Sequence, residues 1–213
     1  LFRRKSLPAQ SPSIVVIGDI CKMRSKLNWF EKKPLFGKNI IVTRARKNSS
    51  KLSKKIIALG GNPIEIPTIE IKPKSSKTIR TNLNKINSYE WLVFTSVNGV
   101  EIFFDEFLKI NKDIRKLGNL KIAAIGSETA RSLNKLNLSV DLIPDKFTAE
   151  GLLNSFKKLK IRKSKIFIPR ASLARDTLVS GLRKIGNEVK EVKIYDTILP
   201  SKLTKKDVLN KVS

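Results

Sequence analysis

Histidine is absent from the 213 residues, and Cys21 is the only cysteine. The absence of histidine excludes Ser-His-Asp and Cys-His catalysis, HExxH zinc sites and imidazole general bases. A single cysteine excludes an intramolecular disulfide framework and a cysteine-rich zinc site, so we expect no metal centre. Any catalysis therefore relies on hydroxyls, carboxylates, lysine, arginine or backbone amides.

Long apolar runs are also missing. No run approaches the ~20 residues that a membrane helix needs, so we expect no membrane association. The stretch Leu1–Gln10 lacks the apolar core of a signal peptide, and nearly cysteine-free sequences are typical of reducing compartments. We therefore predict a cytoplasmic protein.

Acidic residues are scarce: 18 of them face 44 basic residues, which gives a net charge of +26. The basic residues comprise 32 lysines and 12 arginines, and the lysines are spread along the whole chain. Nucleic-acid readers favour arginine for bidentate contacts. The composition therefore favours lysine drift in an AT-rich genome over specific nucleic-acid binding. A polyanionic substrate is a third interpretation.

From Lys38 onward, short apolar runs alternate with segments of helical periodicity. The predicted strands are Asn39–Thr43, Ile64–Ile71, Trp91–Thr95, Lys121–Ile125, Val140–Pro144, Lys165–Pro169 and Glu188–Leu199. The predicted helices are Ser49–Leu59, one marked by Ile79, Leu83 and Ile86, one by Val100, Phe103, Phe104 and Phe107, then Thr129–Leu136, Ala149–Leu159 with Thr148 as its N-cap, and Asp176–Ile185. This alternation predicts an α/β fold of parallel sheets covered by helices.

Two segments resemble each other: Ile57–Ile71 and Leu182–Ile198 each run from a helix end through glycine into a long strand. Both strands are too long for one small sheet. We therefore predict that Pro67–Ile71 and Ile194–Leu199 pair as a two-stranded bridge, with a complete domain at 73–192 between them.

The first 37 residues differ from the rest. Pro12–Ile20 is a strand-like run, and Leu27–Gly37 is a polar and aromatic connector. This pattern predicts the tail of a preceding domain followed by a linker.

The order of several short motifs resembles a known family. They are TSVNGVEIFF at Thr95–Phe104, AAIGSETA at Ala123–Ala130, FTAEGLL at Phe147–Leu153, IPRASLARDTL at Ile168–Leu178 and VKIYDTILP at Val192–Pro200. Together they resemble the uroporphyrinogen-III synthase family. PSIVVIGDI followed by LNWFEKKPLFGKNIIVTRAR resembles the junction between a uroporphyrinogen-III C-methyltransferase and such a synthase.

The resemblance implies two parallel-sheet α/β domains joined by a two-stranded bridge, the first of them discontinuous. It assigns residues 1–37 to the methyltransferase tail and linker, 38–72 with 193–213 to the first domain, and 73–192 to the second. The family's first domain has further βα units after the return strand. We therefore expect this first domain to be truncated, and residues 1–213 alone to have little activity.

The resemblance also implies a reaction. The family's substrate is hydroxymethylbilane, a linear tetrapyrrole rich in carboxylates, which loses water and closes into a ring with inversion of its last pyrrole. No cofactor is implied. Because the substrate is intrinsically reactive, the protein mainly holds it in one shape and directs the attack. This task suits a histidine-free chain.

Carboxylate-binding donors are expected where strands end and helices begin, because helix N-termini offer free N–H groups and a partial positive charge. Four such loops match the family. Their candidate substrate-binding residues are Thr43 and Arg44, then Thr95, Ser96, Asn98 and Gly99, then Gly126, Ser127 and Thr129, and finally Pro169, Arg170 and Ala171. Ordinary helix capping is the alternative interpretation of each loop.

Tyr195 is the candidate catalytic residue. It matches a tyrosine of the family's return strand that is proposed to assist departure of the substrate hydroxyl, and a phenol can donate a proton without a metal. Packing beside the bridge is the alternative role. For the whole chain, a non-catalytic α/β ligand-binding module remains an alternative function, as does a basic nucleic-acid-binding protein.

Overall fold

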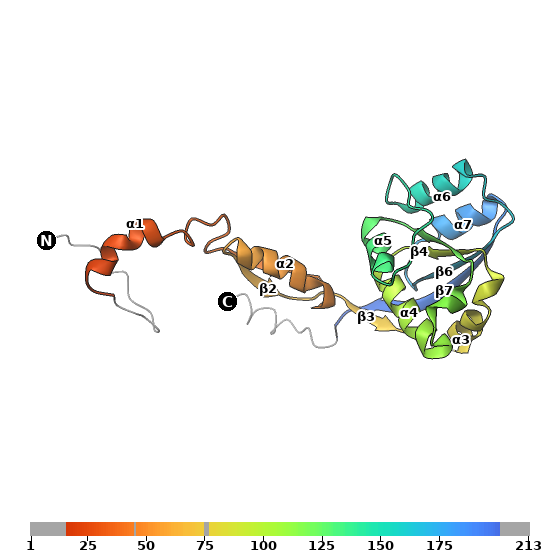
Figure 1. Cartoon of the computed structure of the whole chain (residues 1–213), viewed down its shortest axis with the longest axis horizontal. Coiled ribbons are helices and arrows are strands. Elements are labelled where there is room, and N and C mark those ends of the chain that lie inside the picture. The colour runs from red at the N-terminus through yellow and green to blue at the C-terminus, as the bar shows by residue number, and fades with distance from the viewer. Residues whose placement is uncertain (1–15, 45, 75–76, 201–213) are drawn as a thin grey trace. The chain divides into compact units, whose positions relative to one another are not determined.

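The computed structural model of the chain describes residues 16–44, 46–74 and 77–200. These residues fall into two compact units, 16–68 and 69–200, and each is described by itself (Figure 1). The first unit contains the 3₁₀ turn Asp19–Met23, α1 (Arg24–Leu27), β1 (Asn39–Val42), α2 (Arg46–Ala58) and β2 (Asn62–Glu65). The second contains β3 (Glu70–Pro73), α3 (Lys77–Asn84), the 3₁₀ turn Ile86–Ser88, β4 (Trp91–Phe94), α4 (Val97–Asn111), the 3₁₀ turn Ile114–Leu117, β5 (Lys121–Ala124), α5 (Ser127–Asn134), α6 (Ala149–Lys158), β6 (Lys165–Ala171), α7 (Thr177–Lys184) and β7 (Glu188–Ile198).

In the first unit, β1 and β2 pair in parallel, and α2 connects them. Val42, Ile56 and Ile66 are buried there. Ser53 on α2 donates a hydrogen bond of 2.6 Å to Glu65 at the end of β2. The unit is therefore one βαβ element with a small core.

The second unit is built on a five-stranded sheet in the order β3-β7-β6-β4-β5. The strands β4 to β7 run parallel, and β3 alone is antiparallel, pairing with the end of β7. Helices cover both faces: α3, α4 and α5 pack on one, and α6 and α7 on the other (Figure 1). The sheet is thus buried on both sides, as parallel sheets are.

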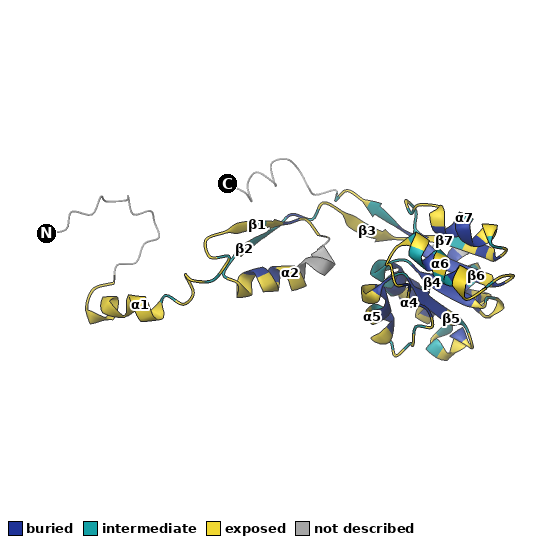
Figure 2. Cartoon of the chain, turned by 90° about the horizontal axis from the view of Figure 1, so that it is seen from above, coloured by how far each residue is buried: buried dark blue, intermediate teal, exposed yellow. Residues whose placement is uncertain are grey.

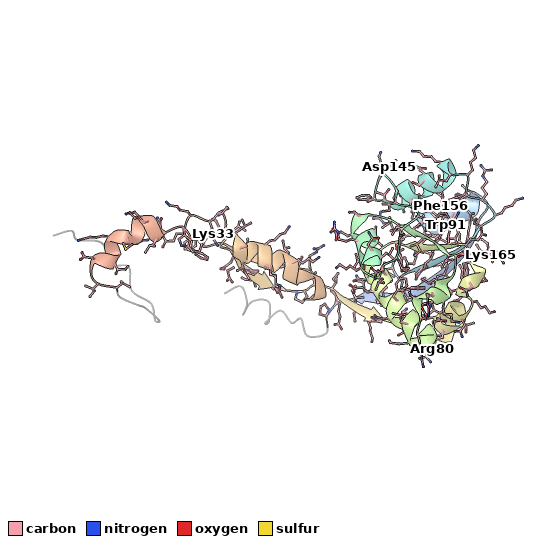
Figure 3. The ribbon with its side chains drawn as sticks, in the orientation of Figure 1. Lys33, Arg80, Trp91, Asp145, Phe156 and Lys165 are labelled. Atoms are coloured by element: carbon pink, nitrogen blue, oxygen red, sulfur yellow. The ribbon has the colours of Figure 1, made fainter. Side chains whose placement is uncertain are left out.

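The interior strand β4 shows how the sequence specifies these two faces. All four of its residues are buried (Figure 2), and they alternate between the two cores. Leu92 and Phe94 pack towards α3, α4 and α5, whereas Trp91 and Val93 pack towards α6 and α7. On the second face the Trp91 and Phe156 rings lie with centroids 5.1 Å apart (Figure 3). A continuous apolar run is therefore what this position in the sheet requires.

The N-cap predicted for α6 is confirmed. Thr148 has extended backbone angles, and its hydroxyl accepts a hydrogen bond of 3.0 Å from the Gly151 N–H. The same arrangement begins α4, where the Ser96 hydroxyl accepts from the Gly99 N–H at 2.9 Å. Both helices thus start at a hydroxyl followed three residues later by glycine.

We expect Thr148→Ala to lower the free energy of unfolding by about 1 kcal/mol, because the first turn of α6 loses its capping acceptor. Thr148→Ser keeps that acceptor and should unfold like the unmodified chain. Urea unfolding followed by circular dichroism measures both variants. Equal stability of Thr148→Ala and Thr148→Ser would show that the cap contributes nothing here.

Three predicted strands differ from the structure. Ile64–Ile71 is not one strand: β2 ends at Glu65 and β3 begins at Glu70, and Pro67, which has no N–H to donate, lies in the gap. Val140–Pro144 is reduced to a single bridge between Leu142 and Ala123. Within Pro12–Ile20, the described residues 16–20 form no strand, because no partner strand pairs with them and Asp19 starts a 3₁₀ turn. Residues 12–15 lie outside the described residues.

The predicted two-stranded bridge is present but displaced along the chain, and its strands run antiparallel. Its pairs run from Glu70↔Ile198 to Pro73↔Tyr195, so only Glu70 and Ile71 of the predicted segment Pro67–Ile71 take part. The fold class is confirmed: the chain is α/β with parallel sheets in two units. The domain boundaries 38–72 with 193–213 and 73–192 stay a prediction. Among the described residues, β3 and all of β7 belong to the compact unit 69–200.

Candidate functional site at the carboxyl edge of the sheet

The carboxyl ends of β4, β5, β6 and β7 meet at one edge of the five-stranded sheet. In open parallel sheets, ligands bind outside this edge. The predicted loops after β4, β5 and β6 all open there, together with the end of β7 that carries Tyr195. The structure therefore brings three of the four predicted loops and the predicted catalytic tyrosine to one edge.

Tyr195 is held against the loop after β4. Its hydroxyl oxygen lies 2.9 Å from the Ser96 Oγ. Side chains alternate along a strand, yet Ile194 and Tyr195 are both buried in the core under α3, α4 and α5. The register explains this, because Arg170 pairs with Lys193 and Ala171 with Tyr195, which leaves Ile194 as the extra residue of a bulge. The bulge turns the tyrosine towards Ser96.

The loops after β4 and β6 also approach each other closely. A side chain at Gly99 would place its Cβ 3.1 Å from the Ser96 Oγ and 3.4 Å from the Pro169 carbonyl oxygen. Gly99 therefore leaves the space in which the two loops meet. Thr95 and Asn98, in the same loop as Ser96, are partly exposed at this edge.

The loop after β5 leads into α5 without a side-chain cap, because the N-cap residue is Gly126. A Cβ there would lie 3.2 Å from the half-exposed Phe147, a residue that the sequence analysis did not select. Ser127 is exposed, whereas Thr129 is buried in the first turn of α5. Ser127 is thus open to a ligand, whereas Gly126 and Thr129 are buried.

Arg170 does not fit its predicted role in substrate binding. Its side chain is only 3% exposed, and its Nε lies 3.2 Å from the Glu191 Oε1. The Nη2 group donates hydrogen bonds of 2.6 Å to the carbonyls of Ala174 and Arg175. The guanidinium is therefore committed to the loop that follows β6. Ala171 is partly exposed, and Pro169 is buried and reaches the site through its carbonyl.

Thr43 and Arg44 lie in the first unit, after β1. Both are exposed, and the Thr43 carbonyl accepts hydrogen bonds from the N–H and hydroxyl of Thr68. Their part in substrate binding stays a prediction.

A second polar group borders Tyr195. Ser172 donates from its N–H to the Tyr195 carbonyl at 3.0 Å. Asp196 forms an ion pair with Lys74, with 3.0 Å between Oδ1 and Nζ. The Ser172 hydroxyl, followed by Lys74, lowers the pKa of the Asp196 carboxyl. In the sequence, Ser172 and Asp196 could be linked to the site only because they follow the predicted residues Ala171 and Tyr195. No sequence feature indicated Lys74.

We expect both Ser172→Ala and Lys74→Ala to raise the pKa of Asp196, because the Ser172 hydroxyl and the Lys74 ammonium each lower it. A lowered pKa stabilises the fold above the carboxyl's unfolded value, and that stabilisation disappears as the pH falls through the folded value. Carboxyl NMR titration measures the shift. Asp113 is the internal control, since Arg115 lowers its pKa elsewhere on the surface. An unchanged Asp196 pKa in either variant would contradict this assignment.

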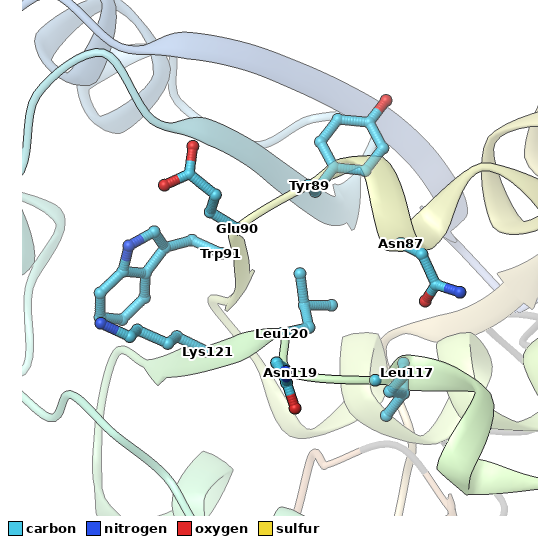
Figure 4. Close-up of a pocket in the computed structure, with 9 residues that line it drawn as sticks. Asn87, Tyr89, Glu90, Trp91, Leu117, Asn119, Leu120 and Lys121 are labelled. Carbon is cyan, nitrogen blue, oxygen red and sulfur yellow. The ribbon is translucent and has the colours of Figure 1, made fainter.

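A pocket of about 300 Å³ lies at the opposite edge, where β4 and β5 begin (Figure 4). Its lining includes Tyr89, Glu90, Trp91 and Lys121, and the Lys121 ammonium lies 5.6 Å from the centre of the Trp91 ring. Burial, followed by the charge of Glu188, raises the pKa of Tyr89. The N-termini of α4 and α5 follow the carboxyl ends of β4 and β5, so we place the candidate site at the carboxyl edge.

The carboxyl edge offers hydroxyl and backbone N–H donors at two helix N-termini and no strong nucleophile. Within residues 16–44, 46–74 and 77–200, no three acidic or cysteine side chains gather where they could hold a metal ion. None of the helices in these ranges combines the length and hydropathy of a membrane span. The site can bind carboxylates and donate a proton from a hydroxyl.

Comparison with known families agrees with this geometry. A family model described as uroporphyrinogen-III synthase HemD matches residues 50–211, which is most of the chain. The chain belongs to the uroporphyrinogen-III synthase family. A uroporphyrinogen III synthase of Thermus thermophilus has a similar fold, with a TM-score of 0.58 at 16% identity, covering 77% of this chain and 64% of that one.

Two curated relatives of this synthase-family chain are much longer than it. The porphyrin biosynthesis protein HemD of Ruminiclostridium josui is 35% identical over 88% of this chain, which spans 38% of that protein. The uroporphyrinogen-III C-methyltransferase of Bacillus subtilis is 28% identical over 94% of this chain, which spans 41% of it. The chain thus covers well under half the length of both relatives.

Proposed function

We propose that the protein is a uroporphyrinogen-III synthase, a lyase that cyclises hydroxymethylbilane to uroporphyrinogen III in tetrapyrrole biosynthesis, with no cofactor. The observation that carries the proposal is the Ser96–Tyr195 pair at the carboxyl edge, in a chain that matches this family over residues 50–211. A buried phenol beside a capping hydroxyl supplies a proton donor where the fold binds its ligand.

The neighbouring loops supply binding groups for the substrate's carboxylates. In this proposal the first turns of α4 and α5 direct N–H groups towards the ligand, and Asn98 and Ser127 add side-chain donors. Thr43 and Arg44, which follow β1 in the first unit, are further candidate binding residues. A net charge of +26 attracts a polycarboxylate from solution without a specific nucleic-acid interface. Because the substrate reacts readily, holding it in one conformation determines which isomer forms.

We further propose that the protein includes a uroporphyrinogen-III C-methyltransferase domain upstream of this synthase domain, and that it acts in the cytoplasm. The support is the Bacillus subtilis methyltransferase, which is similar to 94% of this chain, including residues before the synthase match. The methyl-transferring chemistry would belong to that other domain.

The test is incubation with enzymatically generated hydroxymethylbilane, followed by chromatographic separation of the type I and type III isomers after oxidation. We expect type III product from the full-length protein, and little from residues 1–213 alone. Uncatalysed closure gives the non-inverted type I isomer, which serves as the internal reference. Formation of type I alone by the full-length protein, with tight binding of hydroxymethylbilane, would favour the non-catalytic binding module.

A further inference from the structure

The number of hydrogen-bond donors and acceptors on the Ser96 and Tyr195 hydroxyls limits which of the two can donate to a ligand. The Ser96 hydroxyl has one hydrogen to donate and two lone pairs to accept with. One lone pair already accepts the Gly99 N–H at 2.9 Å. One O–H and one lone pair therefore remain for every other partner of Ser96.

The Tyr195 hydroxyl uses either the remaining O–H or the remaining lone pair of Ser96. The two hydroxyl oxygens are 2.9 Å apart, so one O–H of the pair is used between them. The pair holds two hydroxyl hydrogens, and one is thus left to donate outward. The outward hydrogen is carried by Ser96 if tyrosine donates to serine, and by Tyr195 if serine donates to tyrosine.

Burial decides between these arrangements. Tyr195 is 5% exposed and belongs to the core beneath α3, α4 and α5. Ser96 is partly exposed at the start of α4, in the loop that opens at the carboxyl edge. A ligand at this edge meets the serine first, and the tyrosine lies behind it.

We propose that Ser96 is the residue that protonates the substrate, and that Tyr195 acts through it as the proton source. This inference rests on the proposed function. As the bond from carbon to the substrate hydroxyl breaks, the bonding electrons leave with the oxygen, which takes the Ser96 proton and departs as water. Ser96 takes the Tyr195 proton, which leaves a phenolate. After ring closure, the proton lost from the carbon that formed the new bond returns through Ser96 to Tyr195.

The chain offers a matched control for the structural effect of changing Ser96. Ser96 and Thr148 each cap a helix by accepting from a glycine N–H three residues later. Ser96→Ala and Thr148→Ala therefore lose the same kind of cap and should lower Tm by similar amounts. Only Ser96→Ala also removes a hydroxyl from the site. A lower turnover in Ser96→Ala than in Thr148→Ala therefore measures the proton relay from Tyr195 through Ser96.

The experiment compares kcat in the full-length protein for Ser96→Ala, Tyr195→Phe, both changes together, Ser96→Thr and Thr148→Ala. We expect each of the first two to lower kcat by roughly 5- to 100-fold, with the double variant no worse than the slower single variant. Ser96→Thr keeps a hydroxyl and a cap, so it should recover most of the rate. Thr148→Ala should turn over normally.

A second measurement is the dependence of kcat on the D₂O fraction, which gives the number of protons transferred in the rate-limiting step. With two hydroxyl protons transferred together, kcat should fall along a curve as the D₂O fraction rises, and Tyr195→Phe should make that dependence linear. Wild-type kcat in Ser96→Ala, or losses that multiply in the double variant, would overturn the relay and leave Tyr195 to act directly. If no variant and no unmodified protein forms type III product, the proposed function itself fails.

Discussion

Replacing Arg170 with methionine should lower the free energy of unfolding by about 3–5 kcal/mol. Methionine fills a similar volume but cannot bond the carbonyls of Ala174 and Arg175, and it leaves the Glu191 carboxylate without its partner. Removing one member of a buried ion pair is far more costly than removing an exposed one, because the other charge stays desolvated. Urea unfolding of Arg170→Met beside the unmodified protein measures the effect.

The conservative variant Arg170→Lys keeps the charge but lacks the planar fork that reaches two carbonyls, so we expect an intermediate loss. The control is Arg183→Met. Arg183 is exposed and donates to a single carbonyl, that of Val189, so its loss should cost at most about 1 kcal/mol. If Arg170→Met and Arg183→Met unfold alike, the buried guanidinium is not what holds the loop after β6.

The largest effect on turnover is expected from Tyr195→Phe, a loss of roughly 5- to 100-fold in kcat with KM little changed. Phenylalanine keeps the ring in its core and removes the hydroxyl alone. Ser96 remains bonded to the Gly99 N–H, so stability should fall by about 1 kcal/mol at most. The expected loss is smaller than a strong general acid provides, because the substrate ionises readily and positioning supplies the rest.

Tyr89→Phe is the natural control, since the chain has two tyrosines and Tyr89 lies at the opposite edge of the sheet. Its turnover should match the unmodified protein. Steady-state kinetics with isomer analysis separates the cases. Wild-type kcat in Tyr195→Phe would assign the tyrosine to packing, and a loss in Tyr89→Phe would direct attention to the pocket of about 300 Å³ at that edge.

Thr95→Val provides a contrast within the same loop. It removes a hydroxyl that we expect to bind the substrate, so it should raise KM more than it lowers kcat.

The amino-acid pattern predicted the elements whose side chains are buried on both faces. The run Trp91–Phe94 is apolar throughout because an interior parallel strand is covered on both faces, and it is found as expected. Val140–Pro144 was also predicted as a strand, but next to β5 it makes only one bridge. Periodicity identifies residues that can be buried in a strand; it does not identify the partner that makes them one.

The candidate site was predictable in its location and less so in its details. Parallel topology sends every strand–helix loop to one edge, which is why the loops after β4, β5 and β6 come together. Arg170 was misassigned because an arginine after a strand resembles a carboxylate binder, and burial is not visible in the sequence. The Ser96–Tyr195 contact spans 99 residues of chain and depends on a bulge that no local pattern announces.

The bulge at Ile194 makes the length of β7 a functional parameter. Substitutions at its exposed Lys190 or Lys193 leave the register intact. Inserting a single residue between Ile194 and Tyr195 would instead move the phenol one step along the alternation and turn it to the opposite face, the face of the buried Arg170. Such a protein could keep a well-packed sheet and still have no proton source behind Ser96. In this strand, insertions of one residue are therefore more damaging to activity than most replacements.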